Sequence, residues 1–248
     1  GSEMCIRDRE IKLQQIQELP MKMMQFVSLI NPTDAIHAID RIIDKRKDAI
    51  LIHNSSFMTG LYYELSGLCQ TENCLTILAA LEILKNRGYE ISKKDYHTGF
   101  SDVCEMTGLM GRWQKLQSYP DVICDTGHNA DGFKCIRQQL NYIHNKLNQE
   151  LHIVFGMVND KDISSVLELL PKDATYYFTK ASVKRALPED ELMKMASEAG
   201  LKGTSYPTVA DAVRAAKENC PPKDFIFVGG SNFIVADLLA NRDTLNLY

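Results

Sequence analysis

Short apolar runs alternate with longer amphipathic stretches from Pro120 to the end of the chain. A run of about four to eight apolar residues predicts a buried strand, and apolar residues repeated every three or four positions predict a helix with one buried face. The expected strands are 121–125, 151–158, 174–180 and 224–230, with a shorter one near 203–207, and the expected helices are 130–147, 162–170, 188–199, 209–219 and 232–241. This strict alternation predicts an α/β fold in which a Rossmann-like, mostly parallel sheet has helices on both faces.

The pattern before residue 107 is mainly helical. Residues 73–87 are apolar on nearly every side and stop at Gly88, as expected of a buried helix that ends at a glycine. Ser92-Lys93-Lys94-Asp95 is a capping-box sequence that predicts a second helix, ending near Met106. Two further elements are expected upstream, a helix at 34–46 and a strand at 49–53.

These patterns divide the chain into three parts. Residues 1–9 begin with Gly-Ser and resemble a cloning or sequence-assembly remnant, so we leave them out of the fold prediction. Residues 10–107 are expected to form a mainly helical partial domain, and residues 112–248 a Rossmann-like domain. Glycines and a proline within 107–120 mark the boundary between them.

Composition excludes several classes of protein. The chain is 45% apolar and has a net charge of −4 with acidic and basic residues interspersed, so it has no basic stripe for nucleic acid. Its apolar runs are far shorter than the roughly 18 residues of a membrane span, and it has no secretory signal, which predicts a soluble, cytoplasmic protein. Seven cysteines without a CxxC spacing favour reduced thiols over disulfides or a zinc site.

The most informative motif is Asp125-Thr126-Gly127-His128-Asn129, which lies between the predicted strand 121–125 and the predicted helix 130–147. Ligands of open α/β sheets bind at the carboxyl ends of strands, where a carboxylate can accept hydrogen bonds from ribose hydroxyls. Capping of the helix by Asp125 or Asn129 explains the same residues equally well. His128 would contact a base or a phosphate, or be a structural loop histidine.

Two other turns offer groups for the same site. Arg112 has a planar fork that suits phosphate oxygens, although by itself it reads as an ordinary surface arginine. Its neighbour Trp113, the only tryptophan, is expected to anchor the two domains to each other. Ser231 follows two glycines at the start of a predicted helix, which fits either substrate binding or simple turn chemistry. The turn at 125–132 does not read GxGxxG, which disfavours dinucleotide binding.

In combination, three motifs resemble folylpolyglutamate synthase and its bifunctional dihydrofolate synthase relatives in the Mur ligase superfamily. They are Gln70-Thr71-Glu72-Asn73 opening an apolar helix, Gly111-Arg112-Trp113-Gln114, and the 125–129 motif with its aspartate thirteen residues after Arg112. The resemblance covers about residues 62–248 and includes Gly156-Met157, Asp160-Lys161-Asp162, Arg185-Ala186 and Gly230-Ser231.

This resemblance implies an ATP-dependent amide ligase. Enzymes of the family use ATP to phosphorylate a pteroate or folate carboxylate, and the amine of L-glutamate then attacks the acyl phosphate. By the resemblance, Asn73 and Asp125 hold the nucleoside part of ATP, Arg112 contacts the phosphates, His128 lines the site, and Ser231 lies near the substrate. Mg²⁺ is implied as the accompanying metal ion.

The family also has an N-terminal ATPase domain with a phosphate loop, magnesium ligands and a modified lysine. No GxxxxGK[ST] occurs in this chain, and residues 10–61 match nothing in the family. We therefore expect a C-terminal fragment that is inactive alone and whose apolar helix at 73–87 promotes self-association, whereas the parent enzyme is expected to be monomeric. The alternative is a non-catalytic nucleotide-binding or protein-interaction module. The motifs do not separate dihydrofolate synthesis from polyglutamylation.

Overall fold

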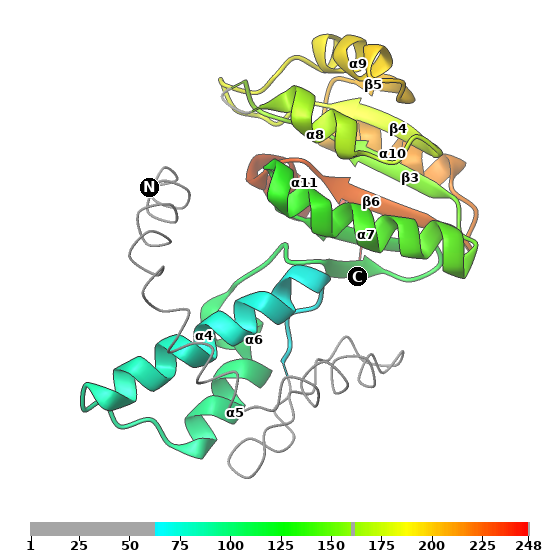
Figure 1. The fold of residues 1–248 in the computed structure, drawn as a ribbon. Coiled ribbons are helices and arrows are strands. Elements are labelled where there is room, and N and C mark those ends of the chain that lie inside the picture. The colour runs from blue at the N-terminus through cyan, green and yellow to red at the C-terminus, as the bar shows by residue number, and fades with distance from the viewer. Residues whose placement is uncertain (1–62, 160–161, 248) are drawn as a thin grey trace. The chain divides into compact units, whose positions relative to one another are not determined.

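The computed structural model describes residues 63–159 and 162–247 (Figure 1). The chain separates into two compact units: the first unit consists of Gly1–Glu64 and Thr71–Thr107, and the second unit of Leu65–Gln70 and Gly108–Tyr248. The elements expected at 34–46 and 49–53 lie outside the described residues, so they stay predictions. We describe each unit by itself.

The described part of the first unit is helical, as its sequence pattern indicates. It contains most of α4 (Leu68–Asn86), together with α5 (Lys93–Ser101) and α6 (Val103–Thr107). The capping box at the start of α5 is confirmed, because Ser92 accepts a hydrogen bond from the Asp95 amide and Asp95 accepts one from the Ser92 amide. The single helix expected up to Met106 is wrong, because the chain leaves helical geometry at Asp102.

Helix α4 begins at Leu68, five residues before the predicted start. Asn73 therefore lies within the helix, and the prediction that Gln70–Asn73 opens it is wrong. Local sequence does not signal this start, since no acidic residue stands in the first turn. The apolar character of α4 is only partly used in packing, because Ile77 is 40% exposed and Leu84 is 36% exposed.

A six-stranded sheet forms the centre of the second unit, in the order β1-β2-β6-β3-β4-β5. Its strands are β1 (Gln114–Gln117), β2 (Asp121–Asp125), β3 (Leu151–Phe155), β4 (Ala174–Thr179), β5 (Lys202–Tyr206) and β6 (Phe225–Gly229). All neighbouring pairs are parallel except β1 with β2. The predicted α/β class with a mostly parallel sheet is confirmed. The antiparallel edge strand β1 was not predicted, because it has only four residues and a single buried side chain, that of Leu116.

Helices cover both faces of this sheet (Figure 1). The core cluster on one face contains residues of α7 (Ala130–Leu147), α8 (Ile163–Leu169) and α9 (Glu189–Glu198), and the cluster on the other face contains residues of α10 (Val209–Asn219) and α11 (Asn232–Ala240). Helix α7 shows why the apolar spacing in the sequence predicted the helices of this unit. Its buried stripe consists of Phe133, Ile136, Leu140 and Ile143, and Leu147, which continues the same spacing at the helix end, is exposed.

Three strands end together in the middle of the sheet. In the register of β2 with β6, Asp125 is the partner of Gly229, and in the register of β3 with β6, Phe155 is the partner of the same Gly229. The amide of Gly156 continues this edge by donating to the Gly229 carbonyl at 3.3 Å. The turns after β2, β6 and β3 therefore lie side by side at the carboxyl edge, where open α/β sheets bind ligands.

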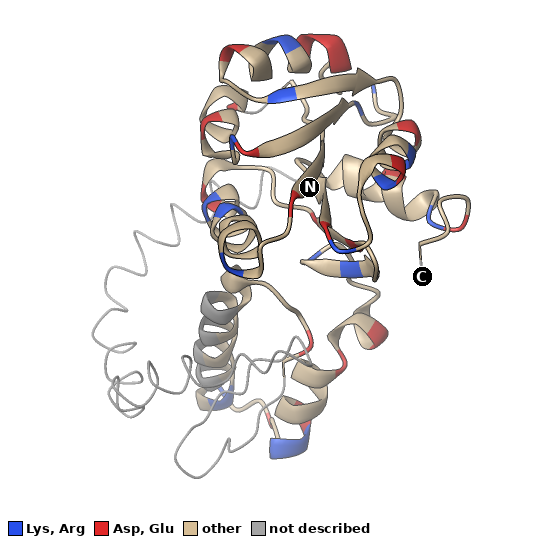
Figure 2. Cartoon of the chain, turned by 90° about the vertical axis from the view of Figure 1, so that its right-hand side faces the viewer, with Lys and Arg blue, Asp and Glu red and all other residues tan. Residues whose placement is uncertain are grey.

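The thiols differ from the sequence-based expectation at two positions. Cys69 and Cys135 form a disulfide, whereas Cys74, Cys104, Cys124 and Cys220 are free. Reduced thiols were expected throughout, and the error arose because a sequence separation of 66 between the paired cysteines gives no spacing signal. Figure 2 shows that basic and acidic residues are interspersed along the described part of the chain. No helix among the described residues is long and apolar enough to cross a membrane.

Candidate functional site

The turn at Gly111–Gln114 is fastened to the turn after β2 by hydrogen bonds. The carbonyl of Gly111 accepts from the Thr126 amide at 2.9 Å and from the Thr126 hydroxyl at 3.1 Å. The Trp113 amide donates to Oδ2 of Asp125 at 2.8 Å. Arg112 stands between these two anchored residues, so its backbone is held at the carboxyl edge of β2. Sequence reasoning did not find this pairing, because it saw Asp125 only as a ligand group or helix cap.

The geometry of this turn requires glycine at position 111. Gly111 has a φ of +74°, and a Cβ atom there would lie 2.7 Å from Cγ2 of Thr126 and 2.8 Å from Cγ1 of Val235. Both distances are shorter than van der Waals contact, and the positive φ strains any other L-residue. The Gly-Arg pair therefore has a local structural reason: glycine lets the chain approach β2 closely enough to place the arginine there.

Asp125 uses both carboxylate oxygens within the protein. Oδ1 accepts from the Gly127 amide at 2.7 Å, and Oδ2 accepts from the Trp113 amide at 2.8 Å. Burial raises the pKa of this carboxyl group above its usual value, while the two amide hydrogen bonds and the positive charge of Arg112 oppose that shift. Each carboxylate oxygen has a second lone pair, so the group can still accept a bond from a ligand hydroxyl.

Arg112 brings a positive charge to this edge. Its side chain is half-buried, and within the described residues no carboxylate lies in ion-pair contact with its guanidinium. A guanidinium offers five donors in a fixed plane, an arrangement that matches phosphate oxygens. The backbone anchors described above hold the base of the side chain, and the fork remains free to bind an anion.

His128 and Asn129 continue the same turn. The Nδ1 atom of His128 lies 3.1 Å from the Thr126 carbonyl, which can only accept, so Nδ1 bears the proton in this contact and Nε2 is the ring nitrogen left for a ligand. Oδ1 of Asn129 accepts from the Gly132 amide at 2.8 Å, which makes Asn129 the N-cap of α7. The capping interpretation is therefore confirmed for Asn129, whereas Asp125 does not cap the helix.

Ser231 at the end of β6 is occupied structurally. Its side chain is 2% exposed, and its hydroxyl accepts from the Ile234 amide at 3.2 Å as the N-cap of α11. The cap uses one lone pair of the hydroxyl, but at 2% exposure its direct contact with a substrate would require the surrounding residues to open. Trp113 is likewise a core residue, whose ring stacks on Phe225 at 6.3 Å and lies 5.8 Å from that of Phe227. Its expected role as an anchor between domains missed this packing within the second unit.

The remaining predicted features do not join this cluster. Asn73 lies on α4 in the first unit, and its role stays a prediction. Asp160 and Lys161 are outside the described residues, and Asp162 caps α8 by accepting from the Ser165 amide at 3.2 Å. The described residues contain no group of three or more His, Cys, Asp or Glu side chains that could hold a metal ion.

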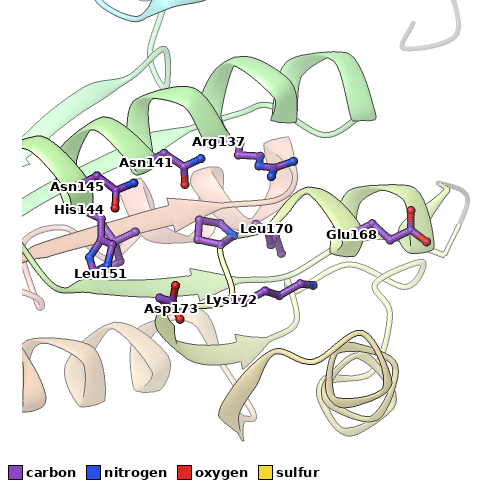
Figure 3. A pocket seen from close by; sticks show the side chains of 10 residues that line it. Arg137, Asn141, His144, Asn145, Leu151, Glu168, Leu170, Lys172 and Asp173 are labelled. Atoms are coloured by element: carbon purple, nitrogen blue, oxygen red, sulfur yellow. The ribbon is translucent and has the colours of Figure 1, made fainter.

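A polar pocket of about 220 Å³ lies elsewhere in the second unit (Figure 3). Arg137 and Asn141 of α7 line it together with Glu168 of α8 and Lys172 in the turn before β4. Leu151, the first residue of β3, also lines it, so the pocket lies near the amino ends of the strands. It contains none of the predicted site residues and is separate from the turns at the carboxyl edge.

Comparison with known proteins identifies the domain that presents these turns. Residues 111–232 match the family model of the Mur ligase, glutamate ligase domain. This part of the chain belongs to the Mur ligase family. The match begins at the glycine of the Gly-Arg turn and ends just after Ser231, so it includes every predicted site residue of the second unit. The family inferred from the three motifs is confirmed.

Relatives of the ligase domain include folate enzymes. The chain is 28% identical over 171 residues to the dihydrofolate synthase/folylpolyglutamate synthase of Buchnera aphidicola subsp. Schizaphis graminum. This alignment covers 68% of this chain and 39% of that protein. Among solved structures, Escherichia coli FolC in complex with DHPP and ADP matches with a TM-score of 0.56 and 26% identity, over 67% of this chain and 38% of that one. Mycobacterium tuberculosis folylpolyglutamate synthase complexed with ADP shares the fold, with a TM-score of 0.62, 22% identity, and coverage of 77% of this chain and 43% of that one. The chain thus spans about two fifths of the length of these relatives.

Proposed function

We propose that this chain contributes the glutamate ligase domain of an ATP-dependent amide ligase that adds L-glutamate to dihydropteroate or a folate. The observation that supports this most directly is the free Arg112 fork beside Asp125 and His128, within a Mur ligase domain. In the proposed reaction, ATP transfers its terminal phosphoryl group to a substrate carboxylate. The amine of glutamate then attacks this acyl phosphate, the C–N bond forms, and phosphate leaves with the C–O bond electrons.

Arg112 is proposed to bind the phosphates of ATP. Charge accumulates on the phosphoryl oxygens during transfer, and a guanidinium already positioned by the protein stabilises that charge without reorganising. The two anchors on either side of Arg112 supply this preorganisation. We assign no metal step to these residues, because the described part of the chain does not provide a cluster that suits Mg²⁺.

Asp125 is proposed to accept a hydrogen bond from the ribose of ATP while it holds the Arg112 turn. Its second lone pairs permit both roles at once. His128 is proposed to line the same site, with Nε2 as the group that faces the ligand. Ser231 is proposed to act near the substrate through the position of its backbone, since its hydroxyl is used to cap α11. Asn73 is retained as a proposed nucleoside contact.

Calorimetric titration with ATP tests the proposed site. We expect Arg112→Ala to weaken ATP binding about tenfold or more, because a charge-assisted contact contributes roughly 1.5–3 kcal/mol. Arg214→Ala is the matched control, since Arg214 is exposed on α10 and pairs with Asp211 at 2.9 Å. Equal affinity of the wild type and the Arg112 variant would contradict the proposal and favour the interaction-module alternative.

The reaction itself has a separate test. Because the sequence has no GxxxxGK[ST], we expect the 248-residue chain with ATP, Mg²⁺, glutamate and a reduced folate to form no glutamylated product. Product formation, followed by mass spectrometry, would contradict the predicted inactivity of the chain. It would also show directly which folate substrate the chain accepts.

A further inference from the structure

Two of the cysteines differ from the rest in their surroundings. Cys69 in the first turn of α4 and Cys135 on α7 are joined, with Cα atoms 6.0 Å apart, and both are half-buried. Burial raises the pKa of Cys74, Cys124 and Cys220 to about 12, so these thiols remain protonated and enclosed at neutral pH. Cys104 is half-buried and free, and burial together with Glu64 raises its pKa. Among the described cysteines, Cys69 and Cys135 alone combine partial exposure with a bonded partner, so they are the pair that can exchange with a disulfide reagent in solvent.

The disulfide attaches the short segment Leu65–Gln70, which contains Cys69, to α7. The segment groups with the second unit, although the rest of α4 belongs to the first. Besides the disulfide, hydrogen bonds to Trp113 and Gln139 hold it. The Ser66 hydroxyl donates to the Trp113 carbonyl at 2.9 Å, and the Leu68 amide donates to Oε1 of Gln139 at 2.6 Å. The segment therefore contacts the residue that directly follows Arg112.

We propose that Cys69 and Cys135 are a reversible thiol–disulfide pair, whose oxidation fixes Leu65–Gln70 on the second unit beside the Arg112–Trp113 turn. The oxidant is a low-molecular-weight disulfide such as oxidised glutathione. One cysteine thiolate attacks it, forming a mixed disulfide and releasing one thiol. The second cysteine then attacks the protein-bound sulfur and releases the other thiol. The protein loses two electrons and two protons, and a dithiol reductant reverses the reaction.

This inference does not depend on the proposed ligase activity. It concerns a modification site whose two cysteines, Cys69 and Cys135, both lie in the second unit. The pairing predicts that reduction removes the covalent attachment of the segment and leaves its hydrogen bonds in place. Local opening of a segment becomes more frequent when fewer contacts must break together.

Thiol mapping of the full chain tests the pairing. After incubation with oxidised glutathione, denaturation and alkylation, we expect two fewer alkylated cysteines than in the dithiothreitol-reduced protein, and a cross-linked peptide that contains Cys69 and Cys135. Cys104→Ser, which removes a half-buried free thiol, should leave this result unchanged. Cys135→Ser should abolish it. Full alkylation of both wild-type cysteines, or glutathione bound separately to each, would overturn the proposal.

Hydrogen exchange tests the structural consequence in the wild-type protein. We expect the amides of residues 65–70 to exchange about tenfold faster after reduction, because opening of the segment is then no longer opposed by a covalent link. Amides of α10, which is remote in sequence and lies on the other face of the sheet, are the internal reference. Identical exchange of residues 65–70 in both redox states would overturn the anchoring role.

Discussion

The turns after β2 and β6 follow neighbouring strands whose last residues, Asp125 and Gly229, are partners in the sheet. The two turns nevertheless use their polar residues differently. After β2, Asp125 and Thr126 fasten a neighbouring turn and leave the Arg112 fork and Nε2 of His128 available. After β6, the Ser231 hydroxyl is consumed as a helix cap within a nearly closed environment. Two strand–turn–helix sequences can look alike although one binds a ligand and the other is structural. They are distinguished only when the hydrogen-bond partner of each donor and acceptor is known.

The largest expected effect comes from the β6 turn, at Gly230. This residue has a φ of +107°, and an added Cβ would overlap the Gly156 carbonyl and lie 2.9 Å from the Phe155 ring. We expect Gly230→Ala to lower the free energy of unfolding by roughly 3 kcal/mol or more, from backbone strain and overpacking together. Urea unfolding followed by fluorescence of Trp113 measures this, because the only tryptophan lies in the core of the second unit.

Gly200→Ala provides the matched control for Gly230. Gly200 also has a positive φ, of +81°, but no atom lies within 4 Å of the added Cβ. Only the conformational cost should appear, about 1 kcal/mol. Similar losses in the two variants would show that the close approach at the β6 turn has no energetic weight.

The next effect in size distinguishes the two helix caps. Ser231→Ala leaves the buried Ile234 amide without its side-chain partner, and we expect a loss of about 2 kcal/mol. Asn129→Ala removes the corresponding bond to Gly132 in a half-buried turn, where water can replace it, and we expect about 1 kcal/mol. The same fluorescence-detected unfolding applies to both. A larger loss for Asn129→Ala would reverse our view of which turn is the more structural.

Sequence patterns predicted the frame of the second unit well, for a reason that α7 illustrates. The spacing of Phe133, Ile136, Leu140 and Ile143 is a local property, and each of these side chains is buried against the sheet. The early start of α4 at Leu68 was missed because its first turn has no acidic residue. Strand β1 was missed because it has four residues and a single buried side chain.

The sequence predicted which residues form the candidate site but not the hydrogen bonds that hold them together. Arg112 and Asp125 were recognised from motif spacing, whereas the bond from the Trp113 amide to Asp125 depends on how two turns meet in space. The disulfide between Cys69 and Cys135 was missed for the same reason. Contacts between distant positions are set by the packing of whole elements, which a single sequence does not display.

The smallest expected stability change is that of His128→Ala. It tests the comparison of the β2 and β6 turns most directly, because the His128 side chain contributes little to the stability of the fold. His128 makes one contact to the Thr126 carbonyl from a half-buried position. We therefore expect His128→Ala to change the free energy of unfolding by at most about 0.5 kcal/mol, as for a surface substitution. Under the proposed function the same variant should weaken ATP binding measurably in calorimetry.

Thr126→Val is the opposite case: it removes the hydroxyl bond to Gly111 and should cost about 1 kcal/mol of stability. If His128→Ala proved as destabilising as Thr126→Val and left ATP binding unchanged, the β2 turn would be as fully structural as the β6 turn.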